Sequence, residues 1–103
     1  MINVFSKEQQ IVVTIATSGV SVSVNGNVER SGTVIDCMQF IRSLVTNYSF
    51  WMEKGKRIVF TVASKDISAE IAKEKSEIVN QLKRLATACK CQVVVNAGLN
   101  NMG

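Results

Sequence analysis

The cysteines are the first residues to weigh as chemical groups, because the chain contains no histidine. Without histidine, the commonest general base, the usual catalytic triads and most zinc sites are excluded. Cys89 and Cys91 flank a single lysine, which is one residue short of the Cys-x-x-Cys spacing, and Cys37 is the third thiol. This set cannot complete a structural zinc site. We therefore expect three free thiols that serve core packing in a reducing compartment, and no metal or cofactor.

Polar residues follow two strand-like runs in the C-terminal half of the chain. Asp66 follows the first run and Asn96 ends the second. Open α/β sheets bind ligands at the carboxyl ends of neighbouring parallel strands, which makes this a location for a site. However, the first loop lacks the glycines of a phosphate cradle, and Asp66 or Ser68 is explained as a helix N-cap. The sequence places no pair of carboxylates for acid–base work, so we do not expect an enzyme.

A third group of residues combines aromatic rings with cations in one segment. Its members are Tyr48, Phe50, Trp51, Lys54, Lys56 and Arg57. Rings beside cations suit base stacking against a phosphate-tracking groove, and they equally suit the hot spot of a protein interface. A third interpretation is that the rings lie in the core and the cations follow a helix C-terminus. The net charge of +4 permits weak attraction to nucleic acid, but the cations after residue 64 are interleaved with acidic residues, which is typical of a solvated helix face.

The elements that position these residues are clearest between residues 56 and 98. The β-branched run 57–63 predicts a buried strand, apolar residues at helical spacing from Ile67 to Cys89 predict a core-facing helix, and the run 92–95 predicts another strand. Strand, helix and strand at this spacing form a βαβ unit with a right-handed crossover.

The first third of the chain predicts an antiparallel meander. Residues 10–16 and 20–24 alternate apolar and small polar side chains, and Asn25-Gly26 then gives the strongest short-range hairpin signal. Asn27 to Arg30 is expected as the return strand. Thr33 is a suitable N-cap for a helix whose apolar arc is wider than one contact with a sheet requires. We expect this helix to end by Gly55.

Together these elements predict one α+β domain over residues 1–97, followed by a flexible tail at 98–103. The expected fold is a two-layer α/β sandwich with a mixed sheet, in the order β-β-β-α-β-α-β. If the third strand runs parallel to the fourth, right-handed crossovers place both helices on one face. The opposite face would expose small, uncharged and partly apolar side chains, which we expect a second copy of the chain to cover. They include Val12, Thr14, Ser21, Ser23 and Thr61.

These observations favour a small non-catalytic protein-interaction module of the inhibitor, immunity or regulatory kind that works as a homodimer. The alternative is a nucleic-acid-binding protein that uses the basic and aromatic segment 48–57. The chain has no run of apolar residues long enough to span a membrane and no signal-peptide pattern at its start. We therefore expect a soluble, cytoplasmic protein without a membrane partner.

Overall fold

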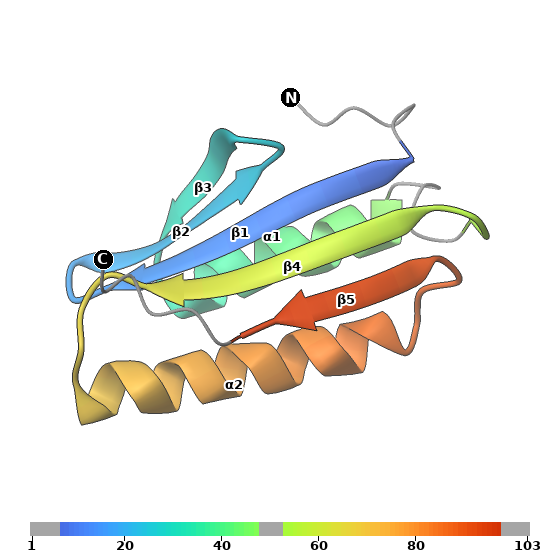
Figure 1. Cartoon of the computed structure of the whole chain (residues 1–103). Coiled ribbons are helices and arrows are strands. Elements are labelled where there is room, and N and C mark those ends of the chain that lie inside the picture. Colours follow the sequence, from blue (N-terminus) through green and yellow to red (C-terminus); the bar gives the residue numbers. More distant parts are fainter. Residues whose placement is uncertain (1–6, 48–52, 98–103) are drawn as a thin grey trace.

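The computed structural model describes residues 7–47 and 53–97 of the chain. Within these residues it shows a mixed five-stranded sheet and two helices (Figure 1). The elements, in chain order, are β1 (Glu8–Ala16), β2 (Gly19–Val24), β3 (Asn27–Gly32), α1 (Val34–Asn47), β4 (Arg57–Ser64), α2 (Ala69–Ala86) and β5 (Gln92–Asn96). The predicted α+β class and element order are confirmed. The segment 48–52 and the predicted tail at 98–103 lie outside the described residues.

The strands lie in the order β3-β2-β1-β4-β5. β1 pairs antiparallel with β2 and parallel with β4, and β4 pairs parallel with β5. β3 and β4 are not neighbours, because β2 and β1 lie between them. β1 buries Ile11, Val13 and Ile15 completely, whereas β3 is polar and almost wholly exposed, so β1 takes the central position and β3 an edge.

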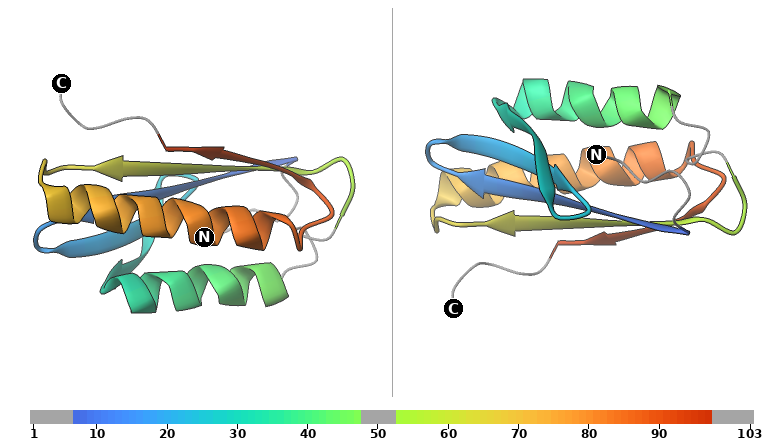
Figure 2. Two further views of the ribbon diagram at one scale, coloured as in Figure 1. Left: turned by 90° about the horizontal axis from the view of Figure 1, so that it is seen from below. Right: turned by 90° about the horizontal axis from the view of Figure 1, so that it is seen from above.

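Both helices cover the same face of the sheet, as the two turned views show (Figure 2). α1 packs against β2 and β3, and α2 packs against β4, β5 and β1. This confirms the predicted two-layer arrangement and the C-terminal βαβ unit. The strands alternate in burial accordingly: in β4, for example, Ile58, Phe60 and Val62 are buried, and the residues between them are partly exposed.

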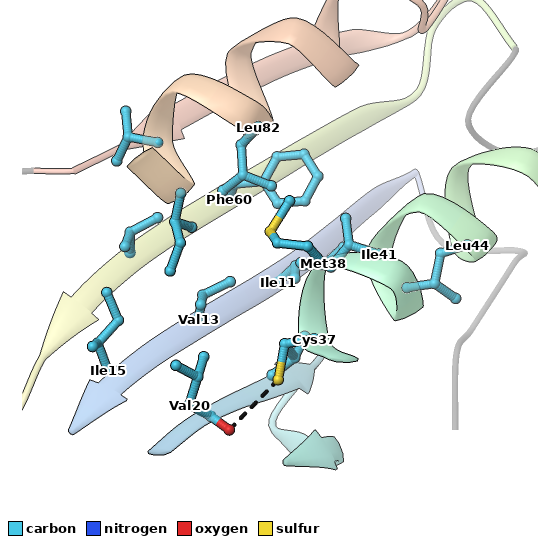
Figure 3. Packing of buried hydrophobic residues seen from close by; sticks show 14 of the residues in the cluster. Ile11, Val13, Ile15, Val20, Cys37, Met38, Ile41, Leu44, Phe60 and Leu82 are labelled. Carbon is cyan, nitrogen blue, oxygen red and sulfur yellow. Dashed lines mark hydrogen bonds between the residues drawn. The ribbon is translucent and has the colours of Figure 1, made fainter. Parts of the chain in front are cut away.

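The core lies between the sheet and the helices (Figure 3). Phe60 is the largest of its fully buried side chains. The inward-facing residues of β1, β2 and β4 are all buried, whereas Val93 and Val95 of β5 are partly buried against the cluster. Ile67 was expected on the core-facing side of the second helix, but this residue is 72% exposed. It precedes α2, whose N-cap is Ser68, and the Ser68 side chain accepts a hydrogen bond from the backbone N–H of Ile71.

The wide apolar arc of α1 is largely used by the fold itself. Cys37, Met38, Ile41 and Leu44 are buried in the core. Phe40 is partly buried, and the guanidinium carbon of Arg30 on β3 lies 5.5 Å from its ring centroid. The predicted N-cap is confirmed, because the Thr33 hydroxyl accepts a hydrogen bond from the backbone N–H of Asp36. Among the described residues of α1, Ile35 is the large apolar side chain left exposed.

Candidate functional site

The sheet face opposite the helices is the candidate site, and we call it the open face. No helix among the described residues packs on it. The positions on this face, set by strand alternation on β1, β2, β4 and β5, are Glu8, Gln10, Val12, Thr14, Ala16, Gly19, Ser21, Ser23, Arg57, Val59, Thr61, Ala63, Gln92, Val94 and Asn96.

The structure brings together all five residues that the sequence assigned to this face. Val12 lies in register between Ser23 of β2 and Thr61 of β4, and Thr14 lies beside Ser21. Each of these five side chains is half-buried. They form one continuous area of hydroxyl and methyl groups across three strands, where directly opposed side chains are in contact range.

Charge on the open face is confined to one end. The Arg57 Nε lies 3.5 Å from a carboxylate oxygen of Glu8, its register partner on β1. Every other open-face position on these four strands is uncharged. Arg57 was expected only in the basic segment, but strand alternation also places it on the open face. Strand alternation back from Thr61 through Val59 could have revealed it.

The rest of the basic segment lies at the same end of the molecule. Lys54 is exposed in the turn before β4. The Lys56 ammonium lies 3.9 Å from a carboxylate oxygen of Glu53. Tyr48, Phe50 and Trp51, the predicted aromatic partners of these cations, lie outside the described residues. The described cations Lys56 and Arg57 therefore each have a carboxylate close by, which reduces the positive charge offered to a polyanion.

The three thiols lie in or against the hydrophobic core. Cys37 is buried, and its Sγ donates to the carbonyl of Val20 at 3.5 Å (Figure 3). Desolvation, followed by the nearby charge of Cys91, raises the pKa of Cys89 to about 11. Desolvation is also the main cause that raises the pKa of Cys37 and of Cys91. Because the thiolate is the nucleophile and the metal ligand, thiols that stay protonated at neutral pH are poorly suited to either role.

Asp66 and Asn96, the polar residues that follow the parallel strands, do not come together in one site. The Asp66 carboxylate accepts hydrogen bonds from the backbone N–H of Thr17 at 2.7 Å and from its hydroxyl at 3.1 Å. Asp66 thus ties the end of β4 to the turn after β1, and Ser68 caps the helix. Asn96 lies on the open face beside Thr61. A hollow of about 390 Å³ is lined by Asp66 but not by Asn96.

The described part of the chain contains no group of three or more cysteine, aspartate or glutamate side chains that could hold a metal ion. None of its helices combines the length and apolarity that crossing a bilayer requires. Searches against family models, curated proteins and solved structures found no match to this chain.

Proposed function

We propose that this protein is a small non-catalytic protein-interaction module, of the inhibitor, immunity or regulatory kind, that acts as a homodimer through its open face. The observation that carries the proposal is the composition of that face. A sheet face that contacts only solvent usually carries charged side chains, which prevent it from associating with other protein molecules. Here the centre of a five-stranded sheet offers valine, alanine, serine and threonine side chains.

The open face is large enough for a stable contact. Strands about 4.8 Å apart and a rise of about 3.3 Å per residue give this sheet a flat projection of about 500 Å². The accessible surface area of pleated side chains exceeds this flat projection. The area of the open face is therefore close to that of a standard interface, which buries about 800 Å² on each partner. Two such faces would pack about 10 Å apart, as stacked sheets do.

A second copy also fits the charges at the end of the face. Such a dimer could have its two-fold axis parallel to the strands and midway between β1 and β4. In that arrangement β1 of each copy faces β4 of the other copy. Because Glu8 and Arg57 are register partners, Glu8 of one copy would then lie opposite Arg57 of the other. An isologous interface of this kind is self-complementary in charge.

Sedimentation equilibrium on the full chain, at about 1–100 μM, tests this assignment because homodimers of this interface class associate in or below that range. We expect a mass of twice 11.3 kDa. Thr61→Lys puts two ammonium groups at the centre of the interface and should weaken association at least about tenfold. Gln39→Lys, on the exposed side of α1, makes the same change in charge and should leave the mass unchanged. A wild-type monomer throughout this range would contradict the homodimer.

The second candidate is nucleic-acid binding through Lys54, Lys56 and Arg57. It is supported by their shared position at one end of β4, and it ranks second because of the carboxylates that accompany two of them. This function requires binding that falls steeply with salt and is lost in the variant Lys56→Glu with Arg57→Glu. No shift of single- or double-stranded probes at low salt would exclude it. In either case the free cysteines support a reducing, cytoplasmic location.

A further inference from the structure

The two edges of the sheet differ in how well they are protected from association. β3 forms one edge and carries the charged side chains of Glu29 and Arg30, and its pairing with β2 skips Glu29. Charges and irregular pairing of this kind keep an edge strand from joining another sheet. β5 forms the other edge with the uncharged sequence Gln-Val-Val-Val-Asn, and its three valines are partly exposed. The β5 edge therefore lacks the protection that β3 has.

The pairing of β5 with β4 shows which backbone groups face this edge. The backbone N–H of Gln92 donates to the carbonyl of Lys56, just before β4, at 2.9 Å. Successive residues of a strand point their N–H and C=O groups to opposite sides within the sheet, so Gln92, Val94 and Asn96 bond to β4. The N–H and C=O groups of Val93 and Val95 therefore point away from β4. On that side no strand of the described chain pairs with β5.

The sequence of β5 is self-complementary about Val94. A second β5 that runs antiparallel with Val94 opposite Val94 places Val93 against Val95 and Gln92 against Asn96. The outward groups then match, because Val93 and Val95 form hydrogen-bonded pairs that exchange both N–H···O bonds. Val94 forms a non-hydrogen-bonded pair, in which side chains approach most closely, and the side-chain amides of Gln92 and Asn96 lie opposite each other. A slip by one residue would set outward groups against inward ones.

The helix layer leaves room for this contact. α2 packs mainly against β4, and also against β1 and β5, so it is centred inward of the edge. Seen from below, β5 is not hidden behind α2 (Figure 2, left). A two-fold axis perpendicular to the sheet would put both copies of α2 on one face. The two β4 strands beneath them would be three strand spacings apart, about 14 Å, which exceeds the about 8–10 Å between packed helices.

We propose that β5 pairs antiparallel, about Val94, with β5 of a second copy of this chain and joins the two sheets into one. The occupant is a second copy because the strand matches itself in hydrogen bonds, valine contacts and amide pairs. This contact goes beyond the dimer proposed above, since it uses the sheet edge and not the open face. A strand pair of five residues is smaller than a standard interface, so it associates more weakly.

Amide hydrogen exchange of the full chain, followed by NMR at about 20 μM and about 1 mM, tests this pairing residue by residue. The N–H groups of Val93 and Val95 face solvent in a separate copy and donate to the other copy in the pair. They should exchange at least about threefold more slowly at the higher concentration, as a dissociation constant on the order of 0.1 mM gives. Val94 is the internal control, because its N–H bonds to β4 and is protected at both concentrations.

Proline and alanine at one position separate edge pairing from side-chain packing. Val95→Pro removes an outward N–H and puts a ring at the edge, while the bonds to β4 are kept. Val95→Ala shortens the same side chain and keeps the N–H. Val93 should lose its concentration-dependent protection in Val95→Pro and keep it in Val95→Ala. Circular dichroism checks that both variants are folded, and Val93→Pro with Val93→Ala repeats the test with Val95 as the reporter.

Val12→Lys separates this contact from the open-face dimer. It adds an ammonium group to the centre of that face, two strands away from β5, and should leave the protection of Val93 and Val95 unchanged. Equal exchange of Val93 at both concentrations, loss of its protection in Val12→Lys, or equal loss in Val95→Ala and Val95→Pro would each overturn the inference. A chain that is monomeric up to about 100 μM but protected at Val93 and Val95 at about 1 mM would retain edge pairing and exclude the open-face dimer.

Discussion

Replacing Asn25 tests how the hairpin that aligns β1 with β2 is held in register. Asn25 has a φ of +52°, and its side chain makes two hydrogen bonds. Its Oδ1 accepts from the backbone N–H of Gln10 at 2.9 Å, and its Nδ2 donates to the Oε1 of Gln9. The Gln9 side chain is completely buried. One asparagine thus supports an unusual backbone angle, a strand end and a buried amide.

The expected cost of Asn25→Ala is the sum of these contributions. Alanine in the left-handed region costs about 1–2 kcal/mol. Loss of the exposed bond to Gln10 costs about 0.5–1 kcal/mol, and loss of a partner for the buried Gln9 carbonyl oxygen costs about 1–3 kcal/mol. The free energy of unfolding should therefore fall by about 2.5–6 kcal/mol. Asn25→Gly removes the same side-chain bonds without the backbone strain and should retain about 1 kcal/mol more than alanine.

Urea unfolding followed by circular dichroism measures these differences directly. Asn27→Ala makes the same chemical change two residues along, at an exposed position, and should cost less than about 0.5 kcal/mol. A second arm combines Asn25→Gly with Gln9→Met. Because both polar partners are then removed, the double variant should be more stable than the sum of the single changes predicts.

Two results would refute the reasoning. If Asn25→Gly is as unstable as Asn25→Ala, the positive φ is not a source of strain. If both cost less than about 1 kcal/mol, the side-chain bonds to β1 contribute little. The register matters for the composition of the open face, because a slip by one residue would exchange the valines of β2 with the serines of that face.

Two further predictions concern single residues. Cys89 loses its proton near pH 9 in the unfolded chain, but only near its pKa of about 11 in the folded protein. The free energy of unfolding should therefore fall as the pH rises through this window, and Cys89→Ala should reduce the fall measured by urea titrations at about pH 8 and pH 10.5. An unchanged pH dependence in the variant would exclude Cys89 as its cause. Gly19 has a φ of +144°, and an added Cβ would lie 3.0 Å from the carbonyl oxygen of Gly32, so Gly19→Ala should cost about 2–4 kcal/mol. Gly55→Ala has positive φ but nothing within 4 Å, so it should cost about 1–2 kcal/mol; equal melting temperatures would show that the close approach to Gly32 is unimportant.

The open face shows where local pattern was sufficient and where it was not. Val12, Thr14 and Thr61 could be assigned to one face because side chains alternate along each strand, and a shared apolar core fixes which side faces inward. Arg57 was assigned by its charge to a basic segment, but the pairing of β4 with β1 places it beside Glu8. The sequence left Asp66 or Ser68 as the helix cap; Ser68 is the cap, and Asp66 instead binds Thr17, which lies far away in the sequence.

The sequence by itself determined the kinds of elements and their inner sides, because the periods of 2 and 3.6 residues are properties of each segment alone. It also determined the Asn25-Gly26 hairpin, since the turn and both strands are neighbours in the chain. Only the tertiary structure decided that β1 lies between β2 and β4 and that Arg57 meets Glu8 on the open face. Each of these depends on contacts between segments distant in the chain, and the apolar pattern of a strand records which side is buried but not which strand lies beside it.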